Sequence, residues 1–249
     1  MVTKKIREKP SSEVKKAGKK VKPESKGDIS VAVISSTCKK RKEESLSAFD
    51  IFQKTIKRAK NLIETHEEGQ DCTEQHFDCF RAAIVLSISA LDAYVRTLVV
   101  DKILACLEEK VLSAKLKEYI KGLLNQDALI EAGRKYEFRE RVEKAIRADF
   151  ETKAFQGEYK INSYMELVGY KDVFEDVSRS ADRNKTKMRA DIERFTKRRH
   201  VIAHCGDFDL NQTLHKENTI KKEQAKECIS MVTLFAEHLD KITSAGPKE

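Results

Sequence analysis

Through most of the chain, apolar residues recur every three or four positions, which is the spacing of one face of an α-helix. The segment 45–69 predicts a first helix that ends near Gly69, with basic residues opposite its apolar face. The segment 72–109 is apolar on more than one stripe. A helix that is apolar nearly all round is a central, buried one, so this segment predicts the core of the fold.

Two more long helices are predicted in the second half of the chain. Residues 189–206 predict a helix that ends near Gly206, and residues 213–243 predict an amphipathic closing helix. The pattern over 111–182 is less regular and predicts a helical insertion of shorter helices. These are broken near three glycines, Gly122, Gly157 and Gly169. The sequence therefore predicts an all-α protein, an antiparallel four-helix bundle with a helical insertion.

Composition agrees with this prediction and marks off the start of the chain. The three prolines are Pro10, Pro23 and Pro247, so no proline interrupts residues 45–246, which make up nearly all of the predicted helical domain over residues 46–249. Residues 1–45 contain 14 Lys and Arg against 6 Asp and Glu, a net charge of +8 that equals the excess of the whole protein. That segment has no aromatic residue, which predicts a disordered basic tail.

The basic tail has two interpretations. Its charge suits an anionic partner such as nucleic acid, and equally a solvated leader with no partner. The start of the chain has no apolar segment after its charged residues, so we expect no secretory signal. No run approaches the roughly 18–20 apolar residues of a membrane span. The six cysteines show no disulfide framework, so a cytoplasmic protein with reduced thiols is expected.

Motifs for metal or cofactor chemistry are weak. Cys72, His76 and Cys79 share one helix face, but a fourth ligand is not evident, and structural zinc takes four. The sequence contains no glycine-rich phosphate loop, no H-E-x-x-H and no G-x-S-x-G. We therefore expect neither a metal site nor a cofactor.

The stretch "RRHVIAHCGDFD" holds the strongest candidate chemistry. Arg199 and His204 form the pattern R-x4-H, and His200 lies one turn before His204 on the same helix face. Arg199 lies about 140° around the helix from His204, at roughly 100° per residue. A straight helix therefore does not point both at one substrate. Two copies meeting across a dimer axis could do so, as could a change of direction near Gly206.

These residue types suit RNA cleavage. A histidine can take a proton from a 2′-hydroxyl or give one to the leaving 5′-oxygen, because its pKa lies near neutral. An arginine can hold the phosphate and the charge that develops on it. When the 2′-hydroxyl is the nucleophile, no metal is required and DNA is not cut.

The sequence resembles a known family in two segments, "RRHVIAHCGD" and "AAIVLSISALDAYVRTLV". Both are similar to the HEPN superfamily, specifically its RiboL-PSP-HEPN branch, over roughly residues 46–243. The resemblance implies a dimeric, metal-independent endoribonuclease, often a toxin or part of a defence system. It also implies Arg199 and His204 as the catalytic pair, with His200 as the polar helper. The helper is often asparagine or aspartate, so this chain departs from the family there.

Three further residues are supporting candidates. Asp92 is an acid in the most apolar segment, and either orients Arg199 or Arg198 or faces water at the edge of the bundle. Arg198 is expected to contact phosphate. Asp207 is expected to cap the turn after Gly206.

The main expectation is an RNA-cleaving homodimer, with an antitoxin or a defence-system protein as a further partner and with no membrane contact. Two alternatives remain open. One is a nonenzymatic HEPN module that binds protein or RNA. The other is a helical scaffold whose tail alone docks on nucleic acid. A basic helix end such as "TKRRH" also meets the helix dipole favourably and needs no substrate for that.

Overall fold

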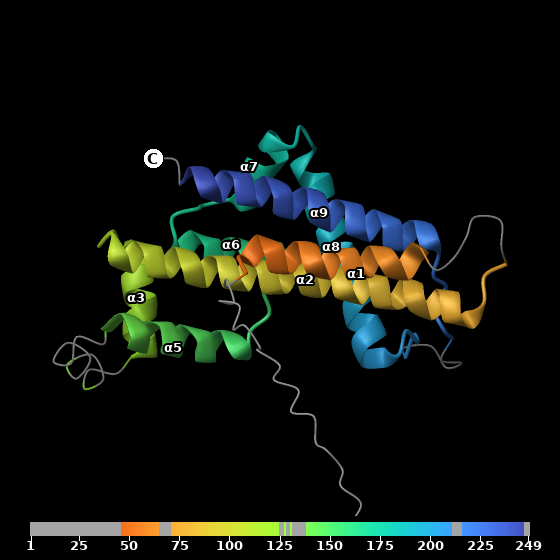
Figure 1. Ribbon diagram of the computed structural model, residues 1–249, viewed down its shortest axis with the longest axis horizontal. Coiled ribbons are helices and arrows are strands. Elements are labelled where there is room, and N and C mark those ends of the chain that lie inside the picture. Colours follow the sequence, from red (N-terminus) through yellow and green to blue (C-terminus); the bar gives the residue numbers. More distant parts are fainter. Residues whose placement is uncertain are drawn as a thin grey trace, which may run out of the picture. The chain divides into compact units, whose positions relative to one another are not determined.

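Four long helices form the bundle in the computed structural model of the protein (Figure 1). They are α1 (Ala48–Glu64), α2 (Glu74–Glu108), α8 (Lys185–Cys205) and α9 (Lys222–Ala245). α2 contacts each of the other three, and α9 also packs on α1 and α8. α1 runs opposite to α2 and α9, while α8 passes across α2 (Figure 1). The structure describes residues 46–64, 71–124, 127, 130, 138–210 and 216–246.

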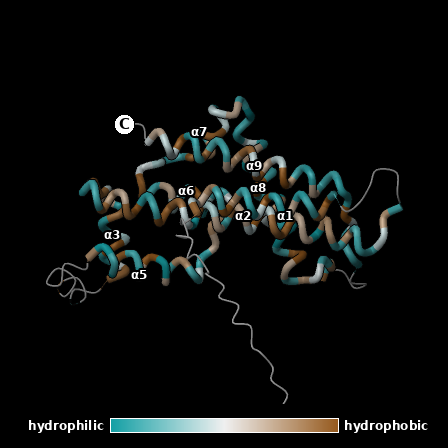
Figure 2. Tube along the Cα trace, viewed as in Figure 1, coloured by the Kyte–Doolittle hydropathy of each residue, from teal (hydrophilic) through white to brown (hydrophobic). Residues whose placement is uncertain are grey.

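The first helix shows how the sequence pattern becomes packing. Ser47 and Asp50 cap it reciprocally: the Asp50 amide donates to Ser47 Oγ and the Ser47 amide donates to the Asp50 carboxylate, both over 3.1 Å. Its buried residues recur at helical spacing: Ala48, Phe52, Ile56, Ala59 and Ile63. Phe52 packs on Tyr94 of α2, with ring centroids 5.6 Å apart. Along each helix in Figure 2, hydrophobic and hydrophilic positions succeed one another.

α2 is the central helix, as its composition predicts. Its buried residues lie along most of its length, from Phe80 to Leu104. By length and composition alone, α2 would also suit a membrane span, which corrects the expectation that no run approaches one. Most of that stretch is covered by the rest of the protein, and a core helix passes the same test.

The region between α2 and α8 is helical, as expected for the insertion. It contains α3 (Ala114–Leu123), α5 (Phe138–Glu151), α6 (Glu158–Leu167) and α7 (Val173–Ser180). Its aromatic side chains pack together: Tyr119, Phe150, Phe155 and Tyr164. Gly157 and Gly169 flank α6 with positive φ values, as breaks should, whereas Gly122 lies inside α3.

The end of α8 decides where the candidate site lies. Gly206 ends the helix with φ +59°, and Asp207 follows it with φ +68°. Two successive left-handed residues reverse the chain. A short antiparallel bridge between Phe208 and Glu217 then brings the chain back towards α9. The prediction that this helix ends near Gly206 is confirmed, and the basic tail over 1–45 lies outside the described residues.

Candidate active site

His200 and His204 lie together on the last turns of α8. Both side chains are exposed, and their ring centroids are 4.5 Å apart with an angle of 44° between the ring planes. α8 is continuous from Lys185 to Cys205, so no break in the helix separates the two rings. The prediction that they share one helix face is confirmed. Two adjacent exposed imidazoles can exchange protons with a substrate at the protein surface.

Arg199 points to a different place. It lines a pocket of about 270 Å³ together with Ser89, Asp92 and Arg96 of α2 and the residues that join α5 to α6. Its Nε atom is buried and has no hydrogen-bond partner among the described residues. Arg199 and His204 of one chain therefore lie on different faces of α8, as the helical angle predicts.

Arg198 has a buried partner instead of an open phosphate position. Its Nη1 and Nη2 atoms lie 2.6 and 2.7 Å from the two carboxylate oxygens of Asp207. The same carboxylate accepts a hydrogen bond of 2.8 Å from Nε of Arg81, on α2. Asp207 is fully buried, while Arg81 and Arg198 keep 11% and 20% of their side chains exposed. Asp207 therefore holds this ion-pair network rather than capping the turn as expected, while the expected contact of Arg198 with phosphate stays a prediction.

The physical reason is the left-handed pair that ends α8. It turns Asp207 back under the helix, where the two arginines meet it. Burial alone would lower the pKa of Arg81, but hydrogen bonds to Asp207 and Asp78 and the charge of Glu217 raise it. The network also holds the returning chain, because the Asn218 amide donates to the Asp207 carbonyl over 2.9 Å. It thus fixes the end of α8 against α2.

Asp92 also has partners other than those expected. One carboxylate oxygen lies 2.7 Å from Arg96 Nη2, and the other accepts from the Phe155 amide over 2.6 Å. Arg96 is four residues along the same helix, so it reaches Asp92 without help from α8. The prediction that Asp92 orients Arg198 or Arg199 is therefore wrong, although Asp92 and Arg199 line the same pocket.

The geometry can now be compared with known proteins. A model of the RiboL-PSP-HEPN family matches residues 37–245. The chain belongs to this family. The resemblance drawn from the two sequence segments is therefore confirmed, and the all-helical fold agrees with it. Searches of curated proteins and of solved structures found no significant match.

Membership of the RiboL-PSP-HEPN family indicates a ribonuclease or another RNA-related function. Within this HEPN domain, sequence reasoning missed Arg81, Arg96 and Gln156. Arg81 stands out as a cation inside an apolar run, and Arg96 follows Asp92 at the spacing of a helical ion pair. No sequence pattern points to Gln156, because only the fold of the insertion brings it to the pocket.

The weak cysteine and histidine motif has a structural explanation in this HEPN domain. His76 Nδ1 accepts a 3.0 Å hydrogen bond from the Thr73 amide, so the imidazole caps the start of α2. Among the described residues, no group of three or more His, Cys, Asp or Glu side chains is placed to hold a metal ion.

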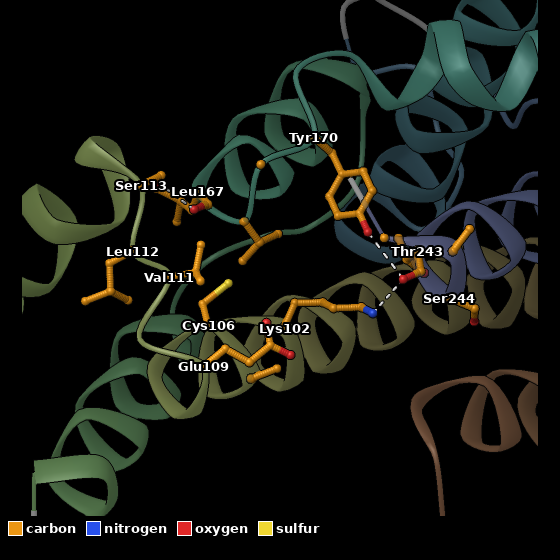
Figure 3. A pocket seen from close by; sticks show the side chains of 15 residues that line it. Lys102, Cys106, Glu109, Val111, Leu112, Ser113, Leu167, Tyr170, Thr243 and Ser244 are labelled. Carbon is orange, nitrogen blue, oxygen red and sulfur yellow. Dashed lines mark hydrogen bonds between the residues drawn. The ribbon is translucent and has the colours of Figure 1, made fainter. Parts of the chain in front are cut away.

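A separate cavity of about 500 Å³ lies by the C-terminal end of α2 (Figure 3). The main polar groups that line this cavity already bond to one another: Lys102 and Tyr170 both donate to the Thr243 carbonyl, over 2.6 and 3.3 Å. Cys106 lines it too, and burial together with the charge of Glu109 raises the pKa of that thiol. No predicted site residue lines this cavity, so the candidate site is the end of α8 and the Arg199 pocket.

Proposed function

We propose that the protein is a metal-independent endoribonuclease that cleaves RNA by attack of a 2′-hydroxyl on the adjacent phosphate. His204 and His200 transfer protons to and from the 2′-oxygen and the 5′-oxygen, and Arg199 binds the phosphate. A cytoplasmic toxin or defence effector, controlled by an antitoxin or a partner protein, is the cellular role that we propose for it.

The contrast between two neighbouring arginines carries the proposal. Arg198 is neutralised by the buried Asp207. Arg199 forms no ion pair with any described residue, although its Nε atom is buried. Buried donors in proteins are almost always hydrogen-bonded, and an unmet one costs about 1–3 kcal/mol. Arg199 is therefore held ready for an anion, in a domain whose family often cleaves RNA.

The direct test is cleavage of an end-labelled RNA in excess EDTA. We expect endonucleolytic products with 2′,3′-cyclic phosphate ends, because the 2′-oxygen becomes bonded to phosphorus and the 5′-oxygen leaves with a proton. The control substrate has a single 2′-deoxy position at a mapped cleavage site. Cleavage at that position, or loss of all activity in EDTA, would contradict the mechanism.

A second copy of the chain is needed if one substrate is to meet both Arg199 and His204. We propose that a two-fold axis brings Arg199 of one protomer next to His204 of its partner. An Arg199→Ala protomer paired with a His204→Ala protomer would then contain one intact site and one doubly defective site. The purified mixed dimer is expected to recover about half of the wild-type rate, since one of two equivalent sites survives.

The measurement uses two affinity tags, so that only mixed dimers are assayed beside the two inactive parent dimers. A mixed dimer as inactive as its parents would mean that each site takes both residues from one chain. That result would contradict the proposed two-fold arrangement.

The nonenzymatic HEPN module remains the second candidate, and one observation favours it. Within a single chain, α8 does not point Arg199 and His204 at one surface. RNA binding without cleavage by the wild-type dimer would select this alternative.

A further inference from the structure

The Arg199 pocket has walls from three separate parts of the chain. They are Ser89, Asp92 and Arg96 of α2, Arg199 of α8, and the connection between α5 and α6 from Glu151 to Ala154 together with Gln156. Its volume of about 270 Å³ lies just below the usual range of small-ligand pockets, so it suits a single chemical group.

Three polar atoms at this pocket are buried and have no partner among the described residues. They are Nε of Arg96, Nε of Arg199 and Oε1 of Gln156. Two of the three are N–H donors on cations, and they come from different helices. Unsatisfied buried groups are rare in proteins, and three of them belong to residues that line this one pocket, so the pocket lacks partners that a bound group could supply.

The charges around the pocket define the class of that group. The acceptors of Asp92 are already used by Arg96 Nη2 and the Phe155 amide. Lys153 Nζ is bound to Asp149 over 2.5 Å, and Glu151 is exposed to solvent. The hydrogen-bonding groups that still lack a partner are therefore mainly guanidinium donors. Their natural partner is an anion whose oxygens only accept hydrogen bonds.

We propose that the Arg199 pocket binds a phosphodiester group of RNA, with Arg96 and Gln156 as substrate-binding residues beside Arg199. The proposal rests on the proposed function for its substrate class. Arg96 keeps Asp92 and the Lys153 carbonyl through Nη2, and its unpaired Nε donates to the phosphate. The side-chain amide of Gln156 donates its N–H to a phosphate oxygen after rotating about its last bond. The helical insertion thereby contributes to the RNA site.

The test measures binding, so that it does not depend on turnover. A fluorescein-labelled single-stranded RNA is titrated by anisotropy with the His204→Ala protein and with two further substitutions made in that background. Gln156→Glu keeps the shape but places a negative charge at the pocket, and is expected to raise the Kd by at least about tenfold. Gln156→Lys adds a cationic donor and is expected to bind as tightly as the parent or more tightly.

The matched control is Gln53→Glu, the same change at an exposed position of α1. It is expected to alter the Kd by less than about twofold, because exposed charges are screened by salt. Far-UV circular dichroism and a thermal melt of each variant show whether the fold is kept. Arg96→Lys is a further variant that keeps the charge beside Asp92 but removes Nε, and is expected to weaken binding.

The outcomes separate the two proposals. Equal affinity for Gln156→Glu and Gln53→Glu would overturn the pocket as a phosphate site and leave the nuclease proposal standing. Equal losses for Gln156→Glu and Gln156→Lys would also overturn it, since only a structural role weakens both alike. If the parent protein binds no RNA and the wild type cleaves none, the proposed function itself fails, and this inference with it.

Discussion

Replacing His204 by alanine is expected to slow RNA cleavage by about 100- to 10,000-fold, the usual contribution of a general acid or base. The side chain is exposed at the end of α8, and its ring lies against that of His200. Alanine is the best helix former, so the substitution leaves the helix intact. Initial rates on the labelled RNA, measured beside thermal unfolding curves, separate lost chemistry from lost structure.

The control for this prediction is His238→Ala, at a half-buried histidine whose Nδ1 lies 2.8 Å from the Ser180 hydroxyl. It removes an imidazole of the same chemistry from a position outside the candidate site, so cleavage is expected to stay within about twofold of wild type. If His204→Ala and His238→Ala cleave equally fast, the activity belongs to another site or another protein.

Replacing Asp207 by asparagine is expected to lower the free energy of unfolding by about 3–5 kcal/mol, the usual cost of breaking a buried ion pair. The substitution conserves shape but removes the charge that neutralises Arg81 and Arg198, which lie 2.8 and 2.7 Å from the same Asp207 oxygen. Two largely covered cations would then lie close together without the buried carboxylate between them. Urea unfolding followed by circular dichroism gives the change from the shift of the midpoint.

Asp191→Asn, on α8 itself, is the matched control. It breaks a 3.0 Å pair with Arg194, whose side chain is 44% exposed, and is expected to cost less than about 1 kcal/mol. If Asp207→Asn costs no more than Asp191→Asn, the network does not hold the end of α8. The RNA cleavage rate of a still-folded Asp207→Asn protein is expected to fall, because His204 lies three residues before the network's carboxylate.

The sequence predicted the helices well because each one is recorded in local periodicity. α2 is apolar nearly all round and is the core, and α8 ends at Gly206 because glycine readily adopts the left-handed conformation there. Local spacing also predicted that Arg199 and His204 face apart. These features depend on residues within a few turns of one another.

Local sequence patterns could not predict the partners of Asp207 and Asp92. Arg81 meets Asp207 across 126 residues of sequence, and Phe155 meets Asp92 across 63. Their contacts depend on how α8 and the insertion pack on α2, which no periodicity records. The composition of α2 likewise suits a membrane or a protein core, and only its neighbours in the fold show that it is largely covered.

The placement of Arg199 and the two histidines on separate faces of α8 has a consequence for how activity depends on protein concentration. Under the proposed two-fold arrangement, an isolated copy would hold two halves of different reaction centres, because Arg199 and the histidine pair lie on separate faces of α8. The cleavage rate per molecule would then rise with the protein concentration until nearly every copy is in a dimer. If the proposed nuclease function is correct, RNA cleavage would therefore rise more steeply than in proportion to the protein concentration.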